Sequence, residues 1–176
     1  MKSNIAKVMD WVFIHEGGYA ERDSEPGGAV NMGISFTAFK DWWQKTQHHI
    51  EPSFAELKAL TRAEAEEIYK AWFFAPIAFD TMPSGVDYAL VDIAVNSGVG
   101  GALRAVSRQL KFPLTGKMTP QLSWALRMRD TNVTIDAICD ARLALMRSSK
   151  KWARFEKNWT ARVDKVRERA HAMVQP

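Results

Sequence analysis

The fold of this chain is decided by its most apolar stretch, residues 84–96, which read SGVDYALVDIAVN. The stretch is long enough for a helix and carries apolar residues on every side. A helix at a protein surface carries them on one face only. We therefore expect a helix that is buried all round and lies at the centre of the fold.

Two of the polar residues in this stretch, Asp92 and Asn96, share one face of the expected helix because they are four positions apart. A polar pair in a buried helix costs free energy unless its groups find partners. For Asp92 we expect a structural role. Asn96, near the helix end, has two open interpretations: it satisfies backbone groups, or it binds the N-acetyl group of a ligand.

Helical periodicity dominates the rest of the chain, and no run alternates convincingly with the period of a strand. Two capping boxes, Ser53 with Glu56 and Thr61 with Glu64, each mark a helix start. Residues 20–35 are irregular, with room for a short hairpin. The main expected helices are residues 4–16, 36–46, 84–96, 132–149 and 159–172. The sequence therefore predicts an all-α fold around a central buried helix.

The chain is expected to fold as two closely packed parts, residues 1–97 and residues 98–176. Gly98, Gly100 and Gly101 make the best boundary, although the turn is too short to uncouple two bodies. At 176 residues, with 47% apolar and 25% charged residues, the chain has the balance of a soluble globular protein.

Several site types are not expected. The single cysteine, Cys139, excludes an internal disulfide and a cysteine-based metal site, and its apolar neighbours predict a buried thiol. The four histidines lack metal-ligand spacing, and no phosphate loop or Rossmann glycine pattern is present. We therefore expect neither a metal nor a cofactor. No stretch is apolar enough to span a bilayer, and the N-terminus is not a standard signal peptide, which predicts synthesis and folding in the cytoplasm.

Positive charge gathers near the C-terminus. Residues 142–169 hold ten Lys or Arg against three acids, a balance of +7 in a chain whose net charge is +4. Such a region favours polyanions, among them nucleic acid, lipopolysaccharide, acidic wall polymers and phospholipid headgroups. A solvated helical face explains the same charges equally well. No recognised DNA- or RNA-reading motif is present, so we expect no specific nucleic-acid partner.

The candidate catalytic group lies in residues 15–19, which read HEGGY. Glu16 falls at the expected end of an apolar helix, where the partial negative charge of the helix terminus disfavours a carboxylate. Apolar neighbours such as Phe13 and Tyr19 would penalise the ionised form further. Both effects would keep the proton on Glu16, as a general acid in glycoside cleavage requires. Glu-Gly-Gly alone is weak evidence, because a glutamate before a helix stop is common.

The order of features along the chain is more specific. Glu-Gly-Gly-Tyr, an acidic loop, Gly-Gly-x-x-x-x-Gly-Ile and a downstream Val-Asn-x-Gly together resemble glycoside hydrolase family 108. This is a lysozyme-like group of bacterial and phage N-acetylmuramidases, often labelled secretion activator proteins. The resemblance implies a lysozyme-like helical fold, a peptidoglycan substrate, action on the cell wall in the periplasm after release, and a peptidoglycan-binding region after about Gly98. A phage or prophage endolysin is one role that fits.

The resemblance also implies site residues. The catalytic glutamate of the family falls on Glu16, and the carboxylate that precedes the second Gly-Gly falls on Glu25, where the family usually has Asp. Asp23 is an alternative partner to Glu25. Tyr19, Asn31 and Asn96 are the expected substrate-binding residues.

One departure from the family pattern affects the mechanism. The family commonly has Thr where this chain has Val30, and the nearest polar replacements are Asn31 and Ser35. Three functions stay open: a muramidase with Glu16 as general acid, a lytic transglycosylase that uses one glutamate without water, and a non-catalytic wall-binding or secretion-accessory protein, which the loss of the Thr favours.

Overall fold

The computed structural model describes residues 2–21, 27–46 and 50–174. The chain forms two compact units. The N-terminal unit is Ala6–Lys70, and the helical unit combines Met1–Ile5 with Ala71–Pro176. Helices dominate both units, as the sequence predicts, and none of the described helices is long and apolar enough to cross a bilayer.

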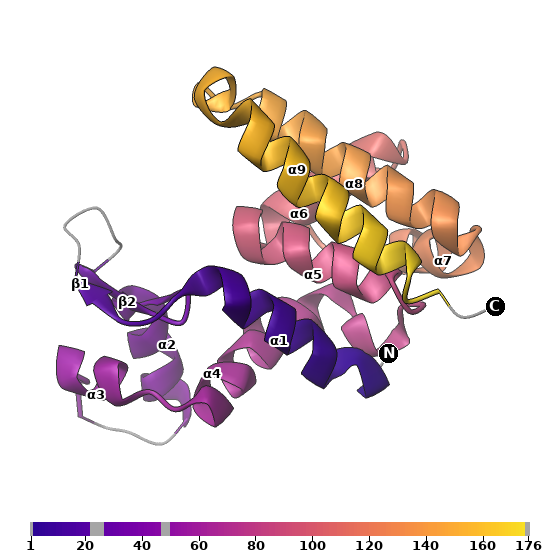
Figure 1. Cartoon of the computed structure of the whole chain (residues 1–176). Helices are drawn as coiled ribbons and strands as arrows, with labels where there is room; N and C mark the ends of the chain where they lie inside the picture. Colours follow the sequence, from indigo (N-terminus) through magenta and orange to yellow (C-terminus); the bar gives the residue numbers. More distant parts are fainter. Residues whose placement is uncertain (1, 22–26, 47–49, 175–176) are drawn as a thin grey trace. The chain divides into compact units, whose positions relative to one another are not determined.

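The N-terminal unit contains helix α1 (Ile5–Glu16) and a small antiparallel sheet. The first residue of α1, Ile5, still belongs to the helical unit. The sheet has the order β1–β2–β3, so each strand pairs with the next along the chain. Its strands are short and lie within residues 20–35, so the short hairpin considered for this irregular stretch is present (Figure 1). They are β1 (Ala20–Glu21), β2 (Ala29–Asn31) and β3 (Ile34–Ser35).

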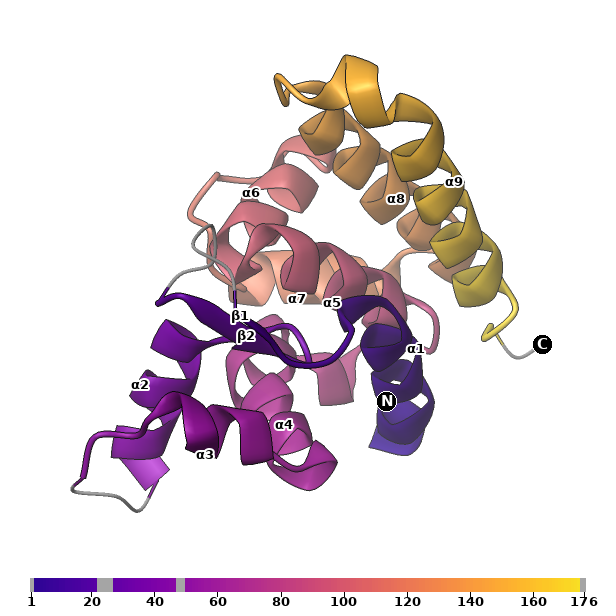
Figure 2. The same cartoon turned by 60° about the vertical axis from the view of Figure 1, so that its left-hand side comes forward.

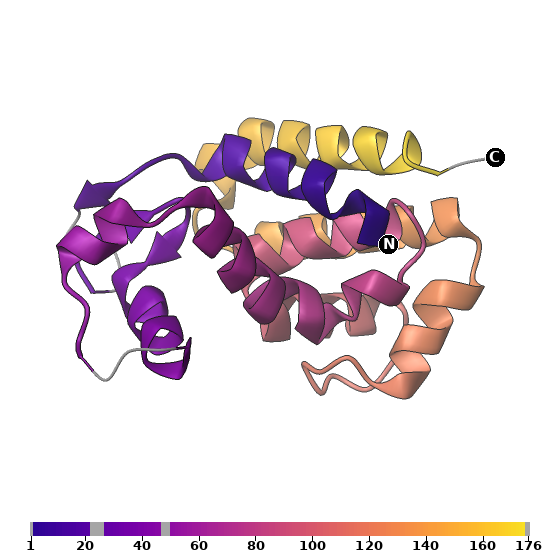
Figure 3. The same cartoon turned by 90° about the horizontal axis from the view of Figure 1, so that it is seen from below.

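Three further helices complete this unit: α2 (Phe36–Thr46), α3 (Phe54–Ala59) and α4 (Arg62–Tyr69). Both predicted capping boxes are confirmed. The side chains of Ser53 and Thr61 accept hydrogen bonds from backbone amides of the first turn, and the carboxylates of Glu56 and Glu64 accept from the backbone amides of Ser53 and Thr61. α2 follows β3 without a loop, and Figure 3 shows it beside the sheet. The helix that opens at Thr61 passes into a wider π-helical turn at Lys70–Phe74.

The helical unit is built around α5 (Val86–Ser97), which packs against α6 (Val99–Gln109), α8 (Thr131–Arg147) and α9 (Trp152–His171). Its residues from Val86 to Ala94 are all buried, so the predicted central buried helix is confirmed. α8 and α9 run side by side as a helical hairpin (Figures 1 and 2). Helix α7 (Pro120–Met128) lies between α6 and α8 along the chain.

Two boundaries differ from the sequence expectation. α9 begins at Trp152 rather than near residue 159, and only residues 148–151 separate it from α8. Its first residue follows Lys151, which makes no side-chain cap, so the start carries no local signal that the sequence could reveal. The two units divide after Lys70, earlier in the chain than the expected division after residue 97, and α5 belongs with the C-terminal helices.

Candidate active site

Glu16 is the last residue of α1, and Gly17 ends the helix with a φ of +72°. Two contacts fix α1 against α4 inside the N-terminal unit. The ring of Phe13 meets that of Tyr69 edge-on, with centroids 5.5 Å apart. Arg62 forms an ion pair with Asp10 and lies 5.2 Å from the Phe13 ring centroid. The position of Glu16 therefore depends on α4 as well as on its own helix.

The turn between β2 and β3 lies next to Glu16. Met32 and Gly33 form its two-residue loop, and both have positive φ values, +47° and +76°. Two positive φ values are typical of the type I′ hairpin turn, which favours Asn-Gly. At Met32 the left-handed conformation costs about 1 kcal/mol. The Tyr69 hydroxyl donates a hydrogen bond of 3.0 Å to the Met32 carbonyl and so stabilises this turn.

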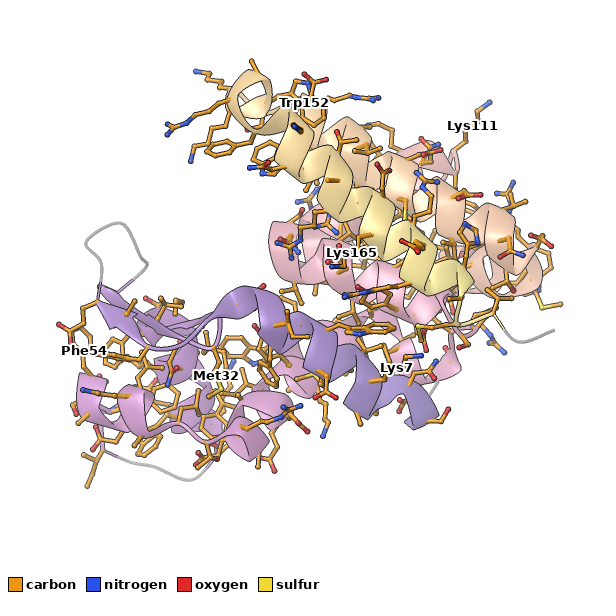
Figure 4. All side chains as sticks on the ribbon, viewed as in Figure 1. Lys7, Met32, Phe54, Lys111, Trp152 and Lys165 are labelled. Carbon is orange, nitrogen blue, oxygen red and sulfur yellow. The ribbon has the colours of Figure 1, made fainter. Side chains whose placement is uncertain are left out.

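The Glu16 carboxylate lies against this turn and the Tyr69 hydroxyl. A Cβ atom added to Gly33 would stand 2.6 Å from Glu16 Oε2 and 2.5 Å from the Tyr69 hydroxyl oxygen, so only glycine fits there. Burial raises the pKa of Tyr69, and the nearby Glu16 charge raises it further. The Tyr69 hydroxyl is thus neutral near pH 7 and remains a hydrogen-bond donor. Figure 4 labels Met32 in this part of the unit.

Tyr19 follows the glycines and is partly exposed. Its hydroxyl donates to Glu21 Oε1 at 2.7 Å, which raises the pKa of Tyr19. The Lys58 ammonium lies 5.6 Å from its ring centroid. These contacts hold the ring on the surface of the unit, where part of it remains accessible. The predicted role of Tyr19 in substrate binding stays a prediction.

Asn31 has a structural function in the N-terminal unit. Its side chain is 6% exposed, and its amide donates to the carbonyls of Leu57 at 2.8 Å and Lys58 at 3.3 Å. The side chain thereby ties β2 to the end of α3. Its contact with substrate stays a prediction. In such a contact the amide would have to share its donors between the substrate and these two carbonyls.

Val30 lies on the opposite face of β2 from the buried Ala29 and Asn31. It is directly opposite Ala20 on one side and Ser35 on the other, and paired residues of a sheet share a face. The Ser35 hydroxyl accepts the Ala38 amide at 3.3 Å at the start of α2. A hydroxyl group thus stands next to the valine that replaces the family's threonine.

Asn96 and Asp92 lie in the helical unit. The Asn96 amide donates to the Asp92 carbonyl at 2.7 Å, one turn earlier in α5, which leaves its substrate role a prediction. Asp92 is buried and pairs with the buried Arg142, and Arg162 lies 3.7 Å from its other oxygen, so its structural role is confirmed. Burial lowers the pKa of Arg142 and the charge of Arg162 lowers it further, while Tyr88 raises it.

The predicted partner carboxylates, Glu25 and Asp23, lie outside the described residues. No sequence signal singles out Tyr69, whose hydroxyl bonds the Met32 carbonyl beside Glu16. Gly33 belongs to the quoted Gly-Ile motif, and its contact with Glu16 explains that glycine. Among the described residues, no group of three His, Cys, Asp or Glu side chains could hold a metal ion.

Comparison with known proteins adds three findings. The family model described as Glycosyl hydrolase 108 matches residues 9–98. A solved structure of Brucella abortus SagA is 35% identical in sequence, with a TM-score of 0.84 over 100% of this chain and 98% of that one. No curated protein matches the chain. The matched residues include Glu16, both Gly-Gly pairs and the turn at Gly33. The chain therefore belongs to glycosyl hydrolase family 108, in agreement with the lysozyme-like helical fold that its motifs imply.

Proposed function

We propose that this glycoside hydrolase is an N-acetylmuramidase. It cleaves the β-1,4 bond between N-acetylmuramic acid and N-acetylglucosamine in peptidoglycan, with Glu16 as the general acid. The observation that carries the proposal is the position of the Glu16 carboxylate, half-buried at the end of α1 and in contact with the strained Met32–Gly33 turn. Strained backbone that the surrounding structure holds in place is frequent at active sites.

Two features of Glu16 support its protonated form. Its place at the C-terminal end of α1 and its partial burial both disfavour a carboxylate. As the bond between the anomeric carbon and the glycosidic oxygen breaks, Glu16 donates its proton to the departing oxygen. A water molecule then supplies the new oxygen at the anomeric carbon and gives its proton to a second carboxylate, for which Glu25 or Asp23 is proposed.

Ser35 is the proposed group that orients this water in place of the family's threonine. It shares a sheet face with Val30 and is paired with it across β2 and β3. A hydroxyl that accepts the Ala38 amide still has a proton to donate and a second lone pair. Asn31 is the weaker candidate, because its amide is already bonded to two carbonyls of α3.

The central experiment compares wild-type protein and Glu16→Gln on purified, lipid-free sacculi. We expect muropeptide release to fall by about 10²–10⁴-fold, the usual contribution of a positioned general acid. The matched control is Glu67→Gln, an exposed glutamate on α4, which should keep most of the activity. Equal release by the Glu16 variant and wild type would remove Glu16 from the mechanism. Mass spectrometry of the products separates reducing ends, which a hydrolase leaves, from the anhydro sugars of a transglycosylase.

A second candidate function, a non-catalytic wall-binding or secretion-accessory protein, is favoured by the absence of a hydroxyl at Val30. Val30→Thr and Ser35→Ala distinguish the two. If Ser35 orients the water, wild type is active and Ser35→Ala loses activity. Adding Val30→Thr to Ser35→Ala should then restore part of that activity. If the chain is only a binding protein, wild type binds sacculi and releases nothing, while Val30→Thr alone could acquire activity.

The C-terminal residues 98–176 are proposed to bind peptidoglycan. An open, mostly apolar pocket of about 470 Å³ is lined there by Phe112, Pro120, Gln121 and Trp124. The Trp124 side chain is 66% exposed, which suits stacking on a sugar ring. We expect Trp124→Ala to weaken binding to sacculi and Met128→Ala, also exposed on α7, to leave it unchanged. In the cell, the protein would act on the wall in the periplasm after release from the cytoplasm, as an endolysin of a phage or prophage would.

A further inference from the structure

The turn between α8 and α9 carries cations and aromatic rings that hydrolysis does not use. We define the hairpin tip as residues 147–159, from the end of α8 through the first two turns of α9. It has one acid, Glu156, against five cations. The cations are all exposed: Arg147, Lys150, Lys151, Arg154 and Lys157.

Three aromatic side chains lie among these cations. Trp152, Phe155 and Trp159 occupy one face of α9, at spacings of three and four residues. Phe155 stacks on Trp159 with centroids 5.5 Å apart, and Trp152 lies 6.2 Å from Trp159. Each ring is partly exposed. Figure 4 shows Trp152 at this turn, with Lys165 farther along α9.

Two cations are in contact with these rings. The Arg147 guanidinium lies 5.7 Å from the Trp152 centroid, and that of Arg154 lies 5.1 Å from the Phe155 centroid. Cation–π contacts leave the hydrogen-bond donors of the guanidinium available for an anion. The tip thus presents rings and free donors together.

Two cations of α9 outside the tip interact with carboxylates of the same unit. Arg167 pairs with Asp136 and Asp140, and Arg162 lies near Asp92. In the part of the chain that the structure describes, no ion pair involves any of the five tip cations. Half of the ten Lys or Arg in residues 142–169 therefore lie at the tip, and all five are exposed.

The tip also contains no buried residue. None of residues 143–162, all of which the structure describes, is buried, although this stretch includes two Leu, one Met, two Trp and one Phe. Flanking positions of the same helices, such as Cys139 and Val163, are buried. Partly exposed apolar and aromatic groups rimmed by cations, in a stretch without a buried residue, are typical of an interaction surface.

We propose that the hairpin tip binds the surface of an anionic phospholipid bilayer. Trp and Arg interleaved on a short amphipathic segment are typical of the membrane–water interface, where rings sit at headgroup level and cations meet phosphates. A basic side chain near an anionic bilayer strengthens association by about fivefold. The tip is the protruding end of a helical hairpin, whereas sugar and nucleic-acid sites are usually grooves. The inference does not depend on Glu16.

The test measures cosedimentation of the full chain with vesicles of phosphatidylcholine, alone or mixed with phosphatidylglycerol. We expect binding only to the mixed vesicles, and weaker binding as salt is raised. Lys150→Gln with Lys151→Gln should weaken binding by about 25-fold. The matched control is Lys111→Gln with Lys117→Gln, two exposed lysines of the same unit that lie outside the tip, which should leave binding unchanged.

Each other outcome overturns the proposal. Equal losses in the two double variants would mean that net charge alone, and not the tip, drives adsorption. Equal binding to both vesicle types, or to neither, would exclude recognition of anionic lipid. Tip-dependent binding to duplex DNA that is as tight as to the mixed vesicles would assign the surface to nucleic acid. Release of muropeptides from lipid-free sacculi should be the same for the tip variant and wild type, which separates this test from that of Glu16.

Discussion

At Gly33 the backbone, the Glu16 carboxylate and the Tyr69 hydroxyl meet within the space of one methyl group. Gly33→Ala would force a left-handed φ on an alanine and drive its Cβ into both side chains. We expect a loss of roughly 2–5 kcal/mol in the free energy of unfolding, from about 1–2 kcal/mol of backbone strain and about 1–3 kcal/mol of overpacking. Muropeptide release should fall with it, because Glu16 must move. Urea unfolding and sacculus digestion measure the two effects.

Two neighbouring glycines supply the controls for that experiment. Gly17 has a φ of +72° but nothing within 4 Å of an added Cβ, so Gly17→Ala should cost only about 1–2 kcal/mol of backbone strain. Gly18 has open space and no positive φ, so Gly18→Ala should be almost neutral. A Gly33→Ala variant as stable as Gly17→Ala would show that the crowding at the turn does not lower the free energy of unfolding.

The single thiol gives a second prediction for one residue. Cys139 is 2% exposed, and burial raises its pKa to about 12. Since the thiolate is the reactive form, an aromatic disulfide reagent at mildly alkaline pH should not label the folded protein. One equivalent should react once urea unfolds the chain. Fast labelling of the folded protein would contradict the burial of this side chain.

The same pKa shift makes stability depend on pH with a definite sign. The thiol ionises near its ordinary pKa of 9.0 in the unfolded chain but near 12 in the folded one. Its contribution to stability is complete below pH 9 and is lost as the pH rises toward 12. Between pH 8 and 10 the loss is about 1 kcal/mol. Cys139→Ala should remove this part of the slope, which urea titrations at both pH values would show as a smaller loss than in wild type.

Within the helical unit, α5, α8 and α9 share one buried ionic cluster around Asp92. Asp92→Ala would leave the guanidinium of Arg142, 2% exposed, without its carboxylate. Breaking a buried pair in this way costs about 3–5 kcal/mol. Adding Arg142→Met should recover much of that loss, because an apolar side chain of similar length replaces the stranded charge. A double-mutant cycle by chemical unfolding measures the coupling, and a loss below about 1 kcal/mol in Asp92→Ala would mean that Arg142 finds another partner.

The elements that the sequence predicts correctly are those with local signals. The two capping boxes and the all-round apolar stretch of α5 depend on residues within one or two turns of each other. The predicted start of α9, near residue 159, is wrong because Lys151 gives no capping signal and residues 150–158 are expected from the sequence to form a loop between two helices. The contact between residues 16, 33 and 69 could not be predicted, since it joins α1, a turn and α4. The family motif therefore identifies Glu16, while Tyr69 becomes visible only in the fold.

At the scale of the whole molecule, charge is divided between the two units. Ala6–Lys70 has seven Lys or Arg and eleven Asp or Glu, a balance of −4, so the remainder of the chain carries +8. An anionic surface attracts the helical unit and repels the unit that holds Glu16. This division favours adsorption through the hairpin tip over adsorption through the candidate active site.

The path of the chain through the two units gives the last prediction. Residues 6–70 are inserted between two pieces of the helical unit, because Met1–Ile5 belongs with Ala71–Pro176. The short first piece is held by Asn4, whose amide donates to Asp87 Oδ2 at 2.7 Å and to Ser84 Oγ at 2.9 Å. Asp87 is fully buried at the start of α5, where it also accepts the Gly85 and Tyr88 amides at 2.9 and 2.8 Å.

Asn4→Ala removes one donor from a buried carboxylate that caps the central helix. We expect the free energy of unfolding to fall by about 1.5–3 kcal/mol, the range for a hydrogen bond to a charged group. Ser3→Ala, next to it and exposed, is the matched control and should change stability by less than about 0.5 kcal/mol. Thermal unfolding followed by circular dichroism measures both. Equal melting temperatures for the two variants would show that the first residues are dispensable to the helical unit and that the insertion does not depend on them.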